Sequence, residues 1–185
     1  GWFNTQLFKL KMLMRVARLW KNDISPAIEA RKKEPKDYVI SFMVKENYPK
    51  KSIIVDVMSY GGAGMMTTRE FIVMAAWHLF EKKDLLDRFL TGGEDDQFAI
   101  LEEILRLEPV ASLNHRRAAE DIDGLRIGPV KQGEVMCLNI RAMNTDEQIT
   151  GPCPYELDPD RAKRMKVVGP YMSFGDGPHR CPGAQ

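Results

Sequence analysis

The sequence predicts a mainly helical fold with a minor β portion. Apolar residues recur at helical spacing over residues 5–33 and over residues 49–80, and a period near 3.6 is the main signal of an amphipathic helix. Beyond Pro109 this period disappears, and glycines and prolines divide the rest of the chain into short segments. Two long helices and an irregular second half are therefore expected.

The first helix is expected over residues 5–33 and ends at Glu34-Pro35, because proline has no amide donor. A shorter helix follows over 36–46, and Asn47-Tyr48-Pro49 forms a turn. The next helix, over 49–80, has roughly 30 residues, whereas the mean is about 11–12. A helix of that length predicts the central element of a fold.

Two further helices complete the helical half. One covers residues 82–90 and ends at Thr91-Gly92-Gly93. The other follows the acidic cluster 94–96, a composition typical of a helix N-terminus. It covers residues 95–107 and is stopped by Pro109.

The second half of the chain is expected to hold little regular structure. Residues 114–140 carry short β-like runs separated by glycines, and residues 141–185 are rich in proline. The chain thus divides into a helical part, a part with short strands, and a meander with a cysteine loop, over residues 1–110, 111–140 and 141–185.

The composition is that of an ordinary globular protein. The chain has 185 residues, of which 44% are hydrophobic and 29% charged, and its formal net charge is +1. These values exclude disordered and collagen-like classes. They also exclude a function that depends on a strong overall field, such as general attraction to nucleic acid. Lysines and arginines interrupt the apolar runs of the first helix, so no membrane span is expected there.

Three cysteines, Cys137, Cys153 and Cys181, lie far apart and form no C-x-x-C pair. An odd, dispersed set disfavours both a disulfide framework and a structural zinc site. A reducing compartment is expected. The chemistry of each cysteine then depends on its neighbours.

The long helix contains an unusual stretch, Tyr60-Gly61-Gly62-Ala63-Gly64-Met65-Met66-Thr67-Thr68. Each glycine in a helix interior costs about 1 kcal/mol relative to alanine, so stability does not explain the stretch. It lacks the Gly-Lys-Ser/Thr ending of a phosphate-binding loop. Two explanations stay equally open: the glycines let a flat or small ligand approach the backbone, or they ease a close helix crossing.

Glu103 and Arg106 lie three residues apart on one face of a helix. On a surface such a pair contributes only about 0.2–0.5 kcal/mol. The leucines and isoleucine around it make the helix unusually apolar, which indicates partial burial. A buried pair needs further partners.

The segment Phe174-Gly175-Asp176-Gly177-Pro178-His179-Arg180-Cys181-Pro182-Gly183 places a cysteine in a glycine-flanked loop. His179 and Arg180 supply positive charge near the sulfur, and the glycines expose backbone N–H donors, so a thiolate is favoured. No His/Asn dyad for nucleophilic catalysis is evident. The segment therefore predicts thiolate ligation of a haem iron in preference to a buried, inert cysteine.

These three motifs, in this order, resemble the cytochrome P450 family: an A-G-x-x-T-T helix, an E-x-x-R helix and an F-G-x-G-x-H-x-C-x-G loop. The resemblance covers essentially the whole chain. The segments similar to the family's helices G, H, I and K are residues 1–33, 36–46, 49–80 and 95–107. The resemblance implies an incomplete P450 fold, without the part before helix G and without the helix after the cysteine loop. An internal piece of one larger domain is therefore expected.

The resemblance implies haem b, iron protoporphyrin IX, as the cofactor. Cys181 would be the proximal thiolate ligand to the iron, with Phe174 packed beside it. His179 would reach one haem propionate. Arg116 resembles the partner of the other propionate, with Arg117 a less favoured choice.

The resemblance also assigns catalytic residues on the long helix. Thr67 matches the threonine that activates oxygen and relays protons, and Thr68 belongs to the same catalytic group. Ala63 and Gly64 match the groove where dioxygen sits.

Other residues match structural and substrate-binding positions of the family. Glu103 and Arg106, completed by Arg161, resemble a buried triad that locks the proximal meander. The residues expected to face the distal pocket or contact substrate are Tyr60, Val110, Ala111 and Ser112.

Two positions depart from the family pattern. Met66 stands where an acidic residue is usual, and a thioether cannot deliver a proton. Water, a substrate hydroxyl or another residue must then supply the route. Pro182 follows the cysteine ligand and has no N–H to bond to the sulfur, so a more strongly donating thiolate is expected.

The expected function is that of a haem-thiolate monooxygenase, which inserts one oxygen atom from O2 into a small apolar organic substrate with electrons from a ferredoxin or flavoprotein. A P450-type peroxygenase, isomerase or dehydratase and an inactive, haem-free fragment stay open as alternatives. The activity is expected of a full-length parent enzyme, with no nucleic-acid partner. A cytoplasmic, bacterial-type enzyme is expected, although an anchor ahead of helix G would lie outside this sequence.

Overall fold

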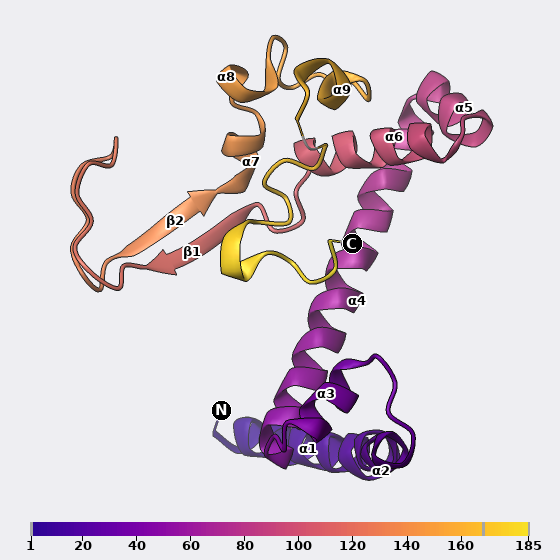
Figure 1. The fold of residues 1–185 in the computed structure, drawn as a ribbon, viewed down its shortest axis with the longest axis vertical. Helices are drawn as coiled ribbons and strands as arrows, with labels where there is room; N and C mark the ends of the chain where they lie inside the picture. Colours follow the sequence, from indigo (N-terminus) through magenta and orange to yellow (C-terminus); the bar gives the residue numbers. More distant parts are fainter. Residues whose placement is uncertain (1, 168, 185) are drawn as a thin grey trace. The chain divides into compact units, whose positions relative to one another are not determined.

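The computed structural model describes residues 2–167 and 169–184. Its regular structure is mostly helical with one two-stranded sheet, so the predicted mainly helical fold with a minor β portion is confirmed (Figure 1). The chain divides into two compact units, residues 1–64 and 65–185. None of the helices described is both long and apolar enough to cross a membrane.

The first unit begins with one long helical run. Helix α1 (Trp2–Leu19) continues through a π-helical segment (Trp20–Ile24) into α2 (Ser25–Lys33), which matches the helix predicted over 5–33. Helix α3 is Val39–Lys45, within the predicted 36–46. The core of this unit is a cluster of four buried side chains, Ile24, Ile28, Met43 and Ile53.

Helix α4 (Lys50–Glu81) is the predicted long helix, and it contributes residues to both units. Its first turns place Ile53 in the core of the first unit, and its last turns place Ala75 and Leu79 in the core of the second. Between them, residues 63–70 are exposed. Helix α4 is thus packed near both ends, while the side chains in its middle turns are exposed.

The second unit continues with α5 (Lys83–Thr91) and α6 (Glu94–Leu107), close to the predicted 82–90 and 95–107. Gly92 joins them in a tight turn, where an added Cβ would lie 2.6 Å from the Arg88 carbonyl oxygen. The acidic first turn of α6 complements the helix dipole. The core of this unit consists of Ala75, Leu79, Leu85, Ile100 and Ile104.

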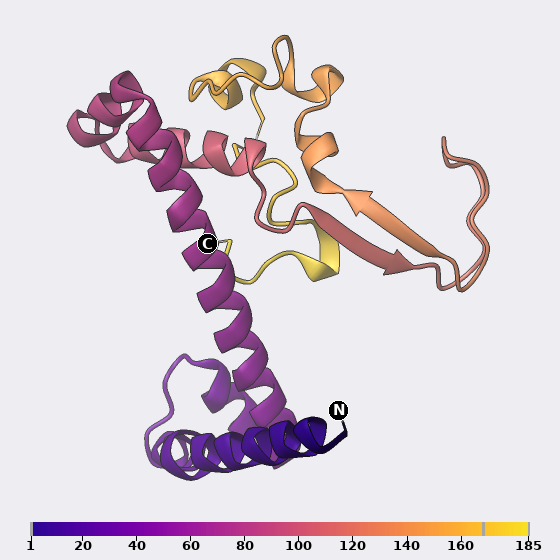
Figure 2. The same cartoon turned by 180° about the vertical axis from the view of Figure 1, so that it is seen from behind.

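Strands β1 (Leu113–Arg117) and β2 (Val135–Asn139) pair antiparallel, with His115 opposite Cys137. Both lie inside the region where short strands were predicted. The connection between them is closed by an isolated bridge between Ile122 and Val130. Figures 1 and 2 show this hairpin extending away from α6.

The loop-rich segment 141–185 also contains short helices that the sequence did not predict. The segment holds α8 (Glu147–Thr150), α9 (Arg161–Met165) and a 3-10 turn (Gly177–His179), and α7 (Ile140–Asn144) ends inside it. Each has three to five residues, too few for a hydrophobic period to show. Three begin with a side-chain cap instead: Asn139 accepts from the Ala142 amide in α7, Asp146 from the Gln148 amide in α8, and Asp176 from the Gly177 amide in the 3-10 turn.

Candidate functional site

The Glu103–Arg106 pair lies on the buried face of α6. Arg106 is 0% exposed and Glu103 3% exposed. The guanidinium donates from Nε to Glu103 Oε2 and from Nη2 to Glu103 Oε1, both at 2.7 Å. This two-pronged contact is the strongest geometry for an arginine and a carboxylate.

Arg161, at the start of α9, completes the group. Its Nε donates to Glu103 Oε1 at 3.1 Å, and its side chain is buried as well. The Asp158 amide donates to the same carboxylate oxygen at 3.1 Å. The structure therefore brings together the three residues of the predicted triad from segments 58 residues apart.

Two buried guanidinium groups share one carboxylate, so carbonyl oxygens must compensate the remaining positive charge. Each arginine uses all five of its N–H donors. The carbonyl oxygens that accept from Arg106 belong to Asn144, Pro154 and Glu156. Those that accept from Arg161 belong to Thr150, Pro152, Cys153 and Glu156. Arg106 and Arg161 thus hold the backbone of residues 144–156, a segment with little regular structure of its own.

A second, more exposed group of ion pairs holds the chain at Asp160, just after residues 144–156. Arg88 on α5 donates to both oxygens of Asp160 at 3.0 Å, and its Nε donates to Asp96 on α6 at 3.0 Å. Hydrogen bonds from Arg88 hold the pKa of the Asp160 carboxyl below its ordinary value of 3.8. Asp160 directly precedes Arg161, so the two groups fix neighbouring residues.

The cysteine loop is shaped by its backbone. Gly175 and Gly177 have φ values of +68° and +65°, a conformation that side chains other than glycine rarely adopt. The Cys181 amide donates to the Phe174 carbonyl oxygen at 2.8 Å and closes the loop. Cys181 carries a free, exposed thiol, which disagrees with a buried, inert cysteine.

The residues predicted to flank the cofactor lie in the same unit as Cys181. Phe174 is half-buried at the start of the loop, and His179 is exposed at the end of the 3-10 turn. Arg116 is exposed on β1, where its Nη1 donates to the His115 carbonyl oxygen at 2.9 Å. The side chains of His179 and Arg116 are therefore both accessible as N–H donors to an anionic group.

The predicted catalytic residues follow one another on α4. Ala63, Gly64, Thr67 and Thr68 are all exposed. Among the described atoms, a Cβ added at Gly61, Gly62 or Gly64 would meet nothing within 4 Å. The described residues therefore leave both explanations for the glycines open.

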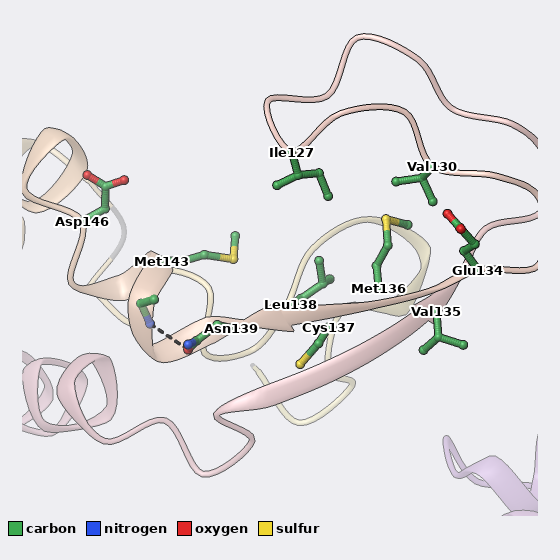
Figure 3. Close-up of a pocket in the computed structure, with 11 residues that line it drawn as sticks. Ile127, Val130, Glu134, Val135, Met136, Cys137, Leu138, Asn139, Met143 and Asp146 are labelled. Atoms are coloured by element: carbon green, nitrogen blue, oxygen red, sulfur yellow. Dashed lines mark hydrogen bonds between the residues drawn. The ribbon is translucent and has the colours of Figure 1, made fainter.

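The predicted substrate contacts are distributed between the units. Val110, Ala111 and Ser112 connect α6 to β1, and the Ser112 carbonyl oxygen accepts from the Ile140 amide at 2.9 Å. Tyr60 lines a groove of about 490 Å³ together with Tyr38, Phe42 and Tyr48. A larger groove of about 800 Å³ follows β2, and none of the predicted site residues lines it (Figure 3).

Sequence reasoning missed two residues that belong to the network. Asn144 is fully buried and contacts both Arg106 and the segment before the cysteine loop. The Tyr171 ring lies 5.9 Å from the Arg106 guanidinium. Burial raises the pKa of the Tyr171 hydroxyl. A polar residue at the end of a one-turn helix and a lone tyrosine give no periodic signal, so neither could be singled out.

The cytochrome P450 family model matches residues 98–185, which include α6, the meander and the cysteine loop. The 2-hydroxy-5-methyl-1-naphthoate 7-hydroxylase of Streptomyces carzinostaticus is 30% identical over 175 residues, which cover 90% of this chain and 40% of that protein. The chain belongs to the cytochrome P450 family. This P450 chain spans less than half the length of the curated relatives it matches, and about 40% of the hydroxylase.

Solved P450 structures agree with the fold. CYP164A2 from Mycobacterium smegmatis, with econazole bound, is 28% identical, and its TM-score is 0.72 over 96% of this chain and 43% of that one. CYP109E1 from Bacillus megaterium, in complex with testosterone, reaches a TM-score of 0.80 over 97% of this chain and 49% of that one at 23% identity. The P450 fold, in part, is therefore the fold of this chain.

Membership of the P450 family implies a haem cofactor, and the residues of the loop fit one. Cys181 offers an exposed sulfur, and iron bound through cysteine sulfur is one of the recurrent haem ligations. An added Cβ at Gly183 would meet only that sulfur, at 3.8 Å. His179 and Arg116 have exposed N–H donors, which suit the carboxylates of such a cofactor. The residues of the loop therefore fit a haem bound through a cysteine sulfur.

Proposed function

We propose that this P450 chain is part of a monooxygenase that inserts one oxygen atom from O2 into a small apolar organic substrate. The observation that carries the proposal is the exposed Cys181 thiol in a loop closed by positive-φ glycines. The curated relative at 30% identity is named as a hydroxylase, which supports an oxygen insertion. The electron donor would be a ferredoxin or a flavoprotein.

Cys181 would bind the iron of haem b through its sulfur, and Phe174 would pack beside it. His179 and Arg116 would hold the two propionates, since each offers an accessible N–H donor to a carboxylate. When bound, a thiolate-ligated haem activates dioxygen, delivers one oxygen atom to the substrate and releases the other as water with two electrons from the donor.

Thr67 would supply a hydroxyl that donates to the oxygen being activated and passes protons toward it. Ala63 and Gly64, one turn earlier, leave the helix surface open for a small molecule. Thr68 would support the same hydroxyl position, and Tyr60, Val110, Ala111 and Ser112 would contact the substrate. Met66 provides no proton, so protons must reach Thr67 through water, a substrate hydroxyl or another residue.

The test is the carbon monoxide difference spectrum of the reduced, haem-loaded protein. A band at the position of thiolate ligation is expected. A protein that binds no haem, or that binds it without a thiolate band, would contradict the proposal and favour an inactive, haem-free fragment.

A second candidate function uses the same haem for peroxygenase, isomerase or dehydratase chemistry, and Met66 is the observation that favours it. Turnover with peroxide and turnover with a reduced donor protein separate the two. Met66→Asp should change the fraction of electrons that end in product if protons limit the reaction. An unchanged fraction would remove Met66 from the mechanism.

A further inference from the structure

Asn144 is buried at the C-terminal end of α7, and both ends of its side-chain amide are used. It is 0% exposed. Its Oδ1 accepts from the Met172 amide at 2.9 Å, while its Nδ2 donates to Ser173 Oγ at 2.8 Å and to the Arg106 carbonyl oxygen at 3.1 Å. Its own carbonyl oxygen accepts from Arg106 Nη1 at 2.8 Å.

These partners lie 28–38 residues away in sequence, so the Asn144 side chain joins distant segments and does not only cap α7. The Ser173 hydroxyl donates onward to the Leu105 carbonyl oxygen at 2.9 Å. Ser173 therefore contacts the Leu105 carbonyl oxygen of α6 directly. Met172 is linked to the Arg106 carbonyl oxygen of α6 through the Asn144 side chain.

The same two residues lead directly into the cysteine loop. The Met172 carbonyl oxygen accepts from the Gly175 amide at 2.9 Å, and the Phe174 carbonyl oxygen accepts from the Cys181 amide at 2.8 Å. A continuous set of hydrogen bonds thus runs from the Glu103–Arg106 pair through Asn144 to the loop of Cys181.

We propose that Asn144 is a positioning residue for Cys181, which it places by holding Met172 and Ser173 against α6. The proposal rests on the proposed haem-thiolate function for its spectroscopic consequence. Only an amide side chain can accept from the Met172 amide and donate to two oxygens at once. An aspartate of the same shape keeps the acceptor but loses both donors, and it turns an oxygen toward the Arg106 carbonyl oxygen.

The experiment compares Asn144→Asp with Asn139→Asp, the same change at the other end of α7. Asn139 caps that helix by accepting from the Ala142 amide at 3.0 Å, which a carboxylate does equally well. The first measurement is hydrogen exchange of the Cys181 amide in the haem-loaded full-length protein. Asn144→Asp should speed it about tenfold, and Asn139→Asp should leave it unchanged.

The second measurement is the thiolate band of the carbon monoxide difference spectrum, which should shrink in Asn144→Asp and persist in Asn139→Asp. If Asn144→Asp leaves both the exchange rate and the band at wild-type values, the proposal is overturned. A wild-type protein with no thiolate band overturns the proposed function, while the exchange rate still tests the placement of the loop.

If Asn144→Asp does not fold, Ser173→Ala supplies the same test. It removes the hydroxyl between Asn144 and the Leu105 carbonyl oxygen but keeps the Met172 contact. An increase of about threefold in exchange at the Cys181 amide is expected. Wild-type exchange in Ser173→Ala would overturn the proposal.

Discussion

Two regions of this chain carry the residues that mark a P450, and they are built in opposite ways. Around α6, charged side chains are buried and every guanidinium donor is used. Along the middle of α4, residues 63–70 are exposed, and apolar side chains such as Met65 and Met66 are 77% and 63% exposed. The region around α6 is held by contacts inside the unit of residues 65–185. The middle of α4, in contrast, presents exposed side chains.

The difference teaches where single changes will act. Removing one partner from a buried ion network strongly lowers stability, because the remaining charges stay buried without a counter-charge. An exposed helical residue has little packing to lose, so its replacement acts on chemistry and leaves stability nearly unchanged. Stability measurements should therefore separate the two regions.

The largest effect is expected from Glu103→Gln. It leaves the charges of Arg106 and Arg161 buried without a counter-charge, so the free energy of unfolding should fall by about 3–5 kcal/mol. Glu102→Gln is the matched control. Glu102 accepts no hydrogen bond in residues 2–167 and 169–184, and burial raises its pKa, so its loss should change stability by about 0.5 kcal/mol or less. Denaturant unfolding measures both. Equal effects would contradict the network.

A pair of identical substitutions compares the regions directly. Thr150 is 0% exposed and donates to the Asp146 carbonyl oxygen at 3.0 Å, so Thr150→Ala should cost about 1–2 kcal/mol. Thr67 is exposed on α4, and Thr67→Ala should change stability by about 0.5 kcal/mol or less. A larger loss in Thr67→Ala than in Thr150→Ala would reverse the comparison.

A smaller and pH-dependent effect is expected from Arg88→Gln. The contacts of Arg88 with Asp160 and with Asp96 are partly exposed, so their joint loss should cost about 1 kcal/mol or less. Because Arg88 lowers the pKa of Asp160, the Arg88–Asp160 contact contributes its full stability above pH 3.8 and loses it as the pH falls through the lowered value.

The stability difference between the Arg88→Gln variant and the wild type should therefore be constant above about pH 5 and shrink toward acid. Unfolding curves at several pH values measure it. Arg69→Gln, which breaks an exposed pair with Glu70 on α4, is the control and should change stability by about 0.5 kcal/mol or less at neutral pH. A difference that does not change with pH would contradict the role of Asp160.

The sequence predicted the long helices well and the network only in part. Apolar periodicity gives α4 its bounds to within one residue at each end, because 32 residues repeat the pattern many times. Glu103, Arg106 and Arg161 could be proposed from the resemblance, but the carbonyl oxygens around them could not. Those contacts depend on the path of residues 144–156, which only the folded backbone defines.

Asn144 shows the limit most clearly. Nothing in its neighbours, Met143 and Thr145, marks it as different from a surface asparagine. Its importance comes from partners 28–38 residues away, and a single sequence does not show such pairing. The cysteine loop could be identified from the sequence, because its glycines, its basic residues and its cysteine all lie within ten consecutive residues.

The claim that Cys181 supplies the thiolate is tested most directly by comparing Cys181→Ser with Cys153→Ser. Both cysteines are free and exposed, so the substitutions are matched in kind. In carbon monoxide difference spectra of the reduced, haem-loaded proteins, Cys153→Ser should keep the thiolate band and Cys181→Ser should lose it. A thiolate band that survives in Cys181→Ser would contradict the assignment.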